Sequence, residues 1–123
     1  MLVIREEQME VLSKYMLKQF EDRMVIHLNQ NFPDETKNIS ESDLRETIST
    51  SIDKAAKYDV TDETDVERYL EYAVRYDPDF DTNPNLPWAT KILGDENLTG
   101  TEKMNQLDDY ELFVLQLGGQ NEL

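Results

Sequence analysis

Residues 58–93, YDVTDETDVERYLEYAVRYDPDFDTNPNLPWATKIL, decide the fold expected for this chain. Thr61 is followed by three acids within four residues, and acids are favourable at the positive end of a helix. Apolar positions then recur at helical spacing: Val66, Tyr69, Leu70, Ala73 and Val74. Asp77-Pro78 should end this helix, and Pro87 suits the first position of a short second one. The stretch predicts two helices joined by an acidic loop that contains proline.

Three further helices are expected on either side of this stretch. Residues 5–30 carry apolar side chains at steps of three and four, residues 41–57 follow Ser40 as N-cap, and Thr99-x-x-Glu102 is a capping box. The last helix is expected to use Met104, Leu107, Tyr110, Leu112, Val114 and Leu115 in the core. We therefore expect an all-α fold: a compact bundle of about five helices, with a long N-terminal helix and an acidic loop before a short Pro-Trp helix. Residues 1–117 would form a single domain, and residues 118–123 a flexible tail.

Composition limits the class of protein further. A chain of 123 residues fits one domain, and the absence of cysteine excludes disulfides and thiolate metal sites. No run approaches the roughly 18 apolar residues of a membrane span. The N-terminus places a short apolar stretch before acids, which is the wrong order for a signal peptide. These features favour a cytoplasmic location.

The net charge of −15 is unevenly distributed along the chain. Residues 1–30 carry a net charge of only −1, so the remainder carries −14. Such a surface repels phosphate groups, which argues against nucleic-acid and anionic-membrane binding. It would attract a basic protein partner at long range, although acidity that serves only solubility is the simpler interpretation.

The acidic loop contains an alternation that resembles half of a calcium site: Asp77, Asp79, Asp81 and Asn83. The second half fails, because Thr82 stands where the sharp turn needs glycine and Trp88 where a bidentate glutamate is needed. Turn capping by the aspartate and asparagine side chains is the favoured interpretation. A recognition loop that displays acids to a partner remains the alternative.

Catalytic and metal sites find little support in the sequence. His27 is the only histidine, and its spacing continues the apolar stripe of the first helix, which favours a structural residue with Glu21 or Asp22 as possible partners. The chain has no glycine-rich phosphate loop, nucleophile elbow or His-Glu-x-x-His motif. We therefore expect no enzyme activity, no catalytic or metal-binding residue, no cofactor and no small-molecule substrate.

Two regions are candidates for contact with a protein partner. The first is the flank of the nearly neutral N-terminal helix, at Val11, Tyr15 and Val25. The second is the acidic loop with the helix that follows it: Asp77, Asp79, Phe80, Asp81 and Trp88. For the apolar Phe80, packing back under the same loop is the alternative. Trp88 beside Pro87 is expected to fill an edge of the core, with an interface anchor as the alternative.

Three stretches together resemble one group of proteins. They are VIREEQMEVLSKYMLKQFEDRMVIHL (residues 3–28), KYDVTDETDVERYLEYA (residues 57–73) and PDFDTNPNLPWATKIL (residues 78–93). They are similar to small accessory proteins encoded beside the adaptors and effectors of type VI secretion systems. The resemblance implies a non-enzymatic co-adaptor or co-chaperone that binds an adaptor or effector toxin for loading. Asp59 departs from the pattern, which has glycine there.

A second functional hypothesis is kept open. A strongly acidic protein would also suit an immunity role, in which it neutralises a cognate toxin by covering the toxin's active site. In both hypotheses the protein acts by binding another protein.

Overall fold

The computed structural model describes the backbone of residues 11–118 and the side chains of residues 14–116. This part of the chain is all-α and contains no β-strand. Its elements are α1 (Val11–Asn31), α2 (Pro33–Thr36), α3 (Glu41–Lys57), α4 (Glu63–Arg75), α5 (Pro87–Leu93), α6 (Gly100–Tyr110) and the π-helical segment η2 (Glu111–Gly118). None of these helices is long and apolar enough to cross a membrane. The expected start of the first helix at residues 5–10 lies outside the described residues.

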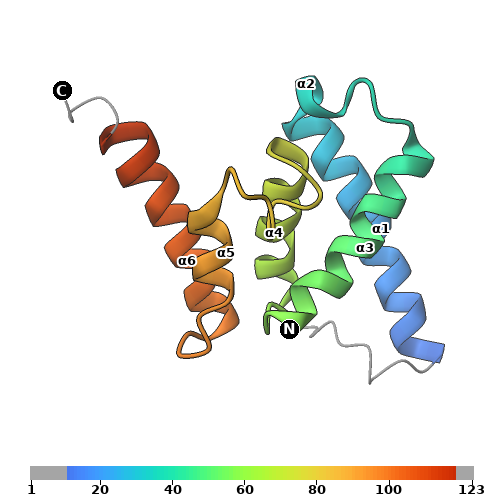
Figure 1. The fold of residues 1–123 in the computed structure, drawn as a ribbon. Coiled ribbons are helices and arrows are strands. Elements are labelled where there is room, and N and C mark those ends of the chain that lie inside the picture. Colours follow the sequence, from blue (N-terminus) through green and yellow to red (C-terminus); the bar gives the residue numbers. More distant parts are fainter. Residues whose placement is uncertain (1–10, 119–123) are drawn as a thin grey trace.

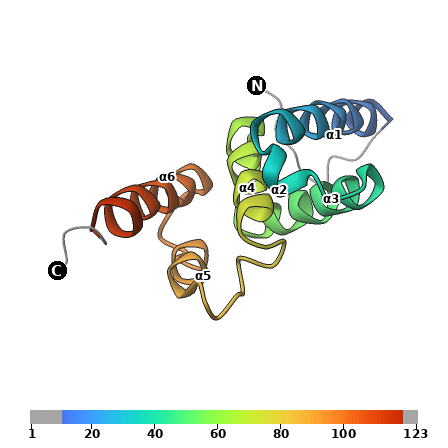
Figure 2. The ribbon, with the colours of Figure 1, turned by 90° about the horizontal axis from the view of Figure 1, so that it is seen from above.

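Helix α4 lies at the centre of the arrangement (Figure 1). Helices α1 and α3 cross on one side of it, and α6 packs along the other side with α5 against α6 (Figures 1 and 2). Helix η2 continues α6 without a break, so the two form one rod that carries the C-terminal end away from α1–α3 (Figure 2). The expected bundle with its long N-terminal helix is confirmed, with the one-turn helix α2 as an addition.

The core follows the helical spacing of the sequence. The stripe of α4 is buried at Val66, Tyr69, Leu70 and Ala73, whereas Val74 is only partly buried. Other helices contribute buried side chains at their own stripes: Phe20, Met24, Leu28, Leu44, Ile48, Ile52, Ala89, Leu93, Met104 and Leu107. The recurrence of apolar residues at steps of three and four thus identified the buried faces of these helices.

Local signals fix the helix ends. The Ser40 hydroxyl accepts a hydrogen bond from the Asp43 N–H at 3.1 Å, which caps α3. At the start of α6, the Glu102 N–H donates to the Thr99 hydroxyl at 3.1 Å, and the Thr99 N–H donates to the Glu102 carboxylate at 2.8 Å. Both bonds of the expected capping box are therefore present, which satisfies two backbone donors that the helix leaves free.

Asp59 ends α3 in the left-handed region, with φ of 65°. The Val60 N–H donates to the Ala55 carbonyl and the Asp59 N–H to the Ala56 carbonyl, which is the bond pattern of a Schellman motif. Glycine normally occupies this position, because it adopts positive φ without a steric penalty. The pattern described above has glycine at position 59, and the positive φ of Asp59 is a conformation that favours glycine.

The start of α6 packs closely on this turn. A Cβ atom on Gly100 would lie 1.9 Å from the carbonyl oxygen of Asp59, so no larger side chain fits without movement of the backbone. The buried Lys103 donates from Nζ to the Tyr58 carbonyl at 3.0 Å. An ammonium group at the C-terminal end of α3 complements the negative end of its dipole, and it joins α6 to α3.

The C-terminal region departs from the sequence-based expectation. Leu112, Val114 and Leu115 are exposed, so the prediction that they belong to the core is wrong. Gly118, the first residue of the expected tail, is the last residue of η2, and residues 119–123 lie outside the described part of the chain.

Candidate functional site

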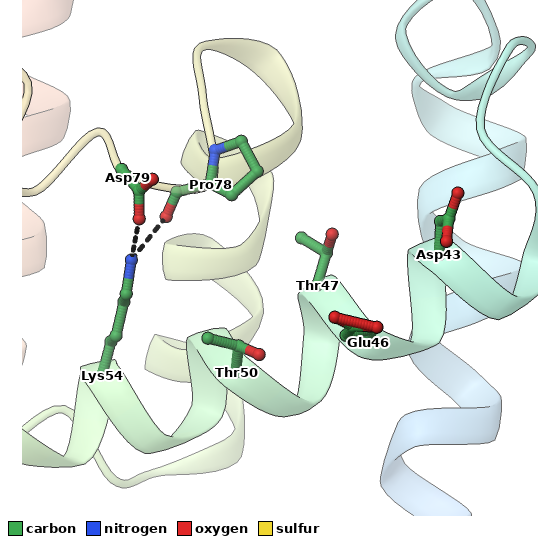
Figure 3. A pocket seen from close by; sticks show the side chains of 7 residues that line it. All are labelled: Asp43, Glu46, Thr47, Thr50, Lys54, Pro78 and Asp79. Atoms are coloured by element: carbon green, nitrogen blue, oxygen red, sulfur yellow. Dashed lines mark hydrogen bonds and ion pairs between the residues drawn. The ribbon is translucent and has the colours of Figure 1, made fainter.

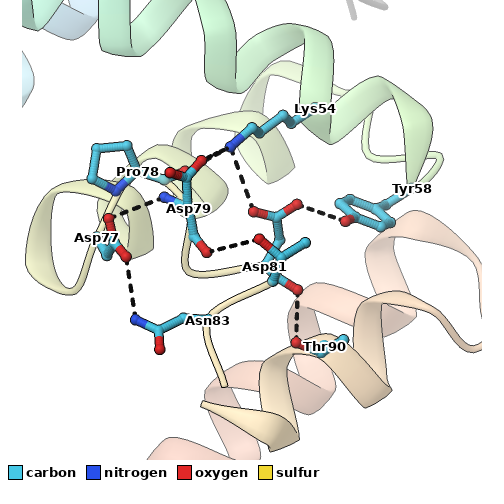
Figure 4. Close-up of polar contacts among 9 residues, drawn as sticks. Lys54, Tyr58, Asp77, Pro78, Asp79, Asp81, Asn83 and Thr90 are labelled. Atoms are coloured by element: carbon cyan, nitrogen blue, oxygen red, sulfur yellow. Dashed lines mark hydrogen bonds and ion pairs between the residues drawn. The ribbon is translucent and has the colours of Figure 1, made fainter. Parts of the chain in front are cut away.

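The acidic loop between α4 and α5 is held by its own carboxylates (Figure 4). Asp77 accepts hydrogen bonds from the Asp79 N–H and from the Asn83 side-chain amide, both at 3.2 Å. Asp79 pairs with Lys54 of α3, and Asp81 accepts from the Tyr58 hydroxyl at 2.6 Å. Each carboxylate therefore has its own partner within the fold, as expected for turn capping and loop anchoring.

Lys54 ties this loop to α3. Its Nζ donates to the Pro78 carbonyl at 3.2 Å and lies 3.6 Å from Asp81 Oδ1, in addition to its contact with Asp79. Burial by itself lowers the pKa of Lys54, but the hydrogen bond and charges of the two aspartates outweigh it, so the pKa is raised. The ammonium form is thus favoured, and it neutralises part of the loop's negative charge.

A shallow hollow of about 280 Å³ lies between α3 and the loop (Figure 3). It is lined by Asp43, Glu46, Thr47, Thr50, Lys54, Pro78 and Asp79. Figure 3 shows the Lys54 amine turned toward the Asp79 carboxylate and the Pro78 carbonyl rather than into open space. The one lysine in the lining of this hollow is thus already paired with groups of the loop.

The structure separates the candidate partner residues into three groups. Val25, Phe80 and Asp81 are buried, which corrects their prediction as partner-facing residues: each is packed or bonded inside the fold. Tyr15 and Asp79 are exposed, while Asp77 and Trp88 are partly buried. The side chain of Val11 lies outside the described residues.

Trp88 packs at the edge of the core within an aromatic cluster. Its ring stacks on Tyr110 with centroids 5.0 Å apart, and it meets the edges of Tyr72 and Tyr76 at 6.4 and 6.0 Å. One side of the indole also lines a surface hollow of about 260 Å³ with Ile92. The expected position at an edge of the core is confirmed, and the cluster joins α4, α5 and α6.

Helices α4 and α6 run parallel in a constant register. Asp65 accepts from Thr101 at 2.5 Å, Tyr72 donates to Asp108 at 2.7 Å, and Arg75 binds Glu111 through both of its terminal nitrogens at 2.6 and 2.9 Å. In each pair the two positions differ by 36 residues. Arg68 adds contacts of 2.7 and 3.1 Å to Asp108 within the same seam.

The rod formed by α6 and η2 extends beyond the end of this seam. Helix α4 ends at Arg75, and the chain turns at Asp77-Pro78. The pair of Arg75 with Glu111 is therefore the last one between α4 and the rod. Four consecutive apolar side chains follow: Leu112, Phe113, Val114 and Leu115 are 44, 57, 45 and 43% exposed. We call residues 112–115 the apolar C-terminal end. Contiguous exposed apolar residues of this kind mark interaction sites on soluble proteins.

Helix α1 offers a weaker apolar surface. Tyr15 and Ile26 are 61 and 58% exposed, but they lie eleven positions apart, about 16 Å along the helix. Charged pairs lie on the same helix, among them Lys18 with Asp22 at 3.6 Å and Arg23 with Glu63 at 2.8 Å. These two side chains are isolated, whereas residues 112–115 are consecutive in the sequence.

His27 meets two glutamates of α4. Its Nε2 lies 2.8 Å from the Glu71 carboxylate and 3.7 Å from that of Glu67. The side chain is 26% exposed. Its expected pairing with Glu21 or Asp22 is wrong, because Asp22 binds Arg45 at 2.8 Å and α1 turns His27 toward α4 instead.

Sequence reasoning missed both the apolar C-terminal end and the group around His27. The run Leu-Phe-Val-Leu at 112–115 has four consecutive apolar residues, and such a run covers more than one helix face, which was a signal of exposure. Glu67 and Glu71 are one turn apart, but nothing local indicated that His27 would face them. Comparisons with protein-family models, curated proteins and solved structures found no match to this chain.

Proposed function

We propose that this protein is a non-enzymatic accessory protein that binds and stabilises an adaptor or effector for loading by a type VI secretion system. The resemblance of residues 3–28, 57–73 and 78–93 supports the assignment to secretion. The apolar C-terminal end supports action by binding: four exposed apolar side chains stand in sequence on a chain of net charge −15. This apolar end is the observation on which the proposal rests most directly.

The expected partner surface follows from what surrounds the apolar end. Of the acids that precede it, Asp109 is exposed, whereas Asp108 and Glu111 are paired with Arg68 and Arg75. A complementary partner would offer an apolar groove that encloses this helix end and is bordered by lysine or arginine. Long-range attraction between acidic and basic surfaces would speed the encounter, and salt would slow it.

Co-purification with the products of the adjacent genes tests the proposal. The full chain carries an affinity tag at its N-terminus, and the adaptor and effector are expressed with it. A stable complex with either product is expected, and its yield should fall when Phe113 is changed to Ser. Failure of both products to bind the wild-type chain would contradict the proposal.

The immunity hypothesis is separated by a second measurement on the same material. The catalytic domain of the neighbouring toxin is assayed with and without a molar excess of the protein. An accessory protein leaves the toxin active, whereas an immunity protein abolishes its activity. The strong negative charge is what favours this alternative, because it would suit a toxin with a basic active site.

A further inference from the structure

Helices α1 and α4 place one imidazole and two carboxylates around a common point. His27 comes from α1, while Glu67 and Glu71 are one turn apart on the facing side of α4. One possible ligand atom of each residue lies within 4.8 Å of those of the other two. We propose that these three residues bind a divalent transition-metal ion, with Zn²⁺ as the representative ion.

The separations from His27 to the two glutamates are close to those between ligands of one ion. Two ligands at about 2.1 Å from a zinc ion are roughly 3.0 to 3.4 Å apart when they subtend an angle of 90 to 109°. His27 Nε2 lies 2.8 Å from Glu71 Oε2 and 3.7 Å from Glu67 Oε2, on either side of this range. The oxygens of the two glutamates lie within 4.8 Å of each other, and rotation of these side chains, which are 36 and 28% exposed, would complete the geometry.

The charges at the site also favour a cation. Two carboxylates face one imidazole, and within the described part of the chain the ion pairs of Glu67 and Glu71 are those with His27. One turn earlier, Glu63 is neutralised by Arg23 at 2.8 Å. A nitrogen ligand with two carboxylates is a donor set that suits Zn²⁺ and similar ions better than Mg²⁺.

The proton of His27 must be placed correctly for binding. The Asn31 amide nitrogen lies 3.2 Å from Nδ1 and 2.8 Å from the His27 carbonyl, which leaves the Nε2 proton pointing at Glu71. Metal binding at Nε2 requires the proton on Nδ1 instead. Because the Asn31 amide nitrogen lies against both Nδ1 and the His27 carbonyl, the Asn31 side chain would move away from Nδ1 when the imidazole changes tautomer. The site retains open positions for water, because its three side chains are partly exposed.

The test uses the full chain and Zn²⁺, with Mg²⁺ as the comparison ion. Because His27 is the only histidine, its ring signals in an NMR spectrum report on this site alone. One equivalent of Zn²⁺ is expected to shift these signals, while excess Mg²⁺ leaves them in place. About 100 µM Zn²⁺ should also raise the melting temperature by roughly 5 °C if the dissociation constant is about 10 µM.

Three variants assign the effect to the site. His27→Gln and Glu67→Gln should each reduce the Zn²⁺-dependent rise in melting temperature to about 1 °C or less, on the same linkage argument. Glu63→Gln is the matched control, since it removes the same charge one turn earlier on α4 and should retain the full rise. His27 ring signals that do not respond to Zn²⁺, or an unchanged rise in the His27→Gln and Glu67→Gln variants, would overturn the proposal.

Discussion

Tyr69 and Tyr72 are both buried on α4, but their hydroxyl groups differ in their surroundings. The Tyr72 hydroxyl donates to Asp108 at 2.7 Å, whereas the Tyr69 hydroxyl has no hydrogen-bond partner within the described structure. A buried polar group without a partner is unfavourable, and a bond to a carboxylate is worth about 1.5–3 kcal/mol. Tyr69→Phe should therefore leave the free energy of unfolding unchanged or raise it, while Tyr72→Phe should lower it by roughly 2 kcal/mol.

Urea unfolding of the two variants and the wild type measures this difference. The pair is matched, because each variant removes one hydroxyl from the same helix and leaves the ring in place. If Tyr69→Phe destabilised the protein as much as Tyr72→Phe, the Tyr69 hydroxyl would have a partner that the structure does not show.

Asp59 is the second residue for which the structure predicts how a substitution changes the free energy of unfolding. Its φ of 65° costs a side chain with Cβ about 1–2 kcal/mol relative to glycine, partly offset by the larger freedom of glycine in the unfolded chain. Asp59→Gly should raise the free energy of unfolding by about 0.5–1 kcal/mol, and Asp59→Ala should lower it. Urea unfolding of both variants provides the test, and a lower stability of the glycine variant than of the alanine variant would contradict the assigned turn.

At the scale of elements, we expect the apolar C-terminal end to contribute to partner binding but little to the free energy of unfolding. Its four side chains are exposed and follow Glu111, the last residue of the α4–α6 seam. A chain truncated after Glu111 should retain its free energy of unfolding within about 0.5 kcal/mol, as exposed substitutions generally do. It should lose binding to the adaptor or effector. Denaturation and pull-down of the truncated chain measure both, and a loss of several kcal/mol would show that residues 112–118 belong to the core.

The sequence predicted most elements because their signals are local. The Ser40 cap and the Thr99–Glu102 box fix the starts of α3 and α6, and helical spacing identifies the buried faces. The exposure of residues 112–115 could not be predicted from such signals. It depends on which residue of the α6–η2 rod lies beside the last residue of α4, and these residues, Arg75 and Glu111, are 36 positions apart in the sequence.

The candidate site was predicted less well than the fold. Asp79 and Tyr15 are exposed as expected, but Val25 faces the core and Phe80 lies under its own loop. Phe80 packs between Tyr69 and Tyr72, with centroids 4.9 and 5.6 Å away. An apolar residue within an acidic loop can point inward or outward, and only the tertiary packing of its neighbours decides between the two.

For the whole molecule, buried tyrosines predict an alkaline limit to stability. Burial raises the pKa of Tyr69 and Tyr72 above their usual value, and burial with the Glu111 hydrogen bond raises the pKa of Tyr76 to about 12. The unfolded chain loses these protons near pH 10, whereas the folded chain keeps them. Stability is therefore fully present below about pH 10 and falls as the pH rises from there.

The size of this effect can be measured by urea unfolding at about pH 8 and about pH 11. Tyr69 and Tyr72 together should lower the free energy of unfolding by roughly 2–3 kcal/mol at the higher pH, since each adds about 1.4 kcal/mol per pH unit above 10. The loss in the Tyr72→Phe variant should be smaller than in the wild type by about 1.4 kcal/mol, the contribution of one such tyrosine at about pH 11. An equal loss in that variant and the wild type would mean that other groups cause the alkaline instability.

The claim that the protein acts through its apolar C-terminal end is tested most directly by two matched substitutions. Phe113 and Ile26 are 57 and 58% exposed, on η2 and α1 respectively. The affinity of each serine variant for the co-purifying adaptor or effector is measured by calorimetry. Phe113→Ser should weaken binding by roughly tenfold or more, as loss of an aromatic anchor does, while Ile26→Ser should leave it unchanged. Weaker binding by Ile26→Ser together with unchanged binding by Phe113→Ser would contradict the account and place the partner on α1.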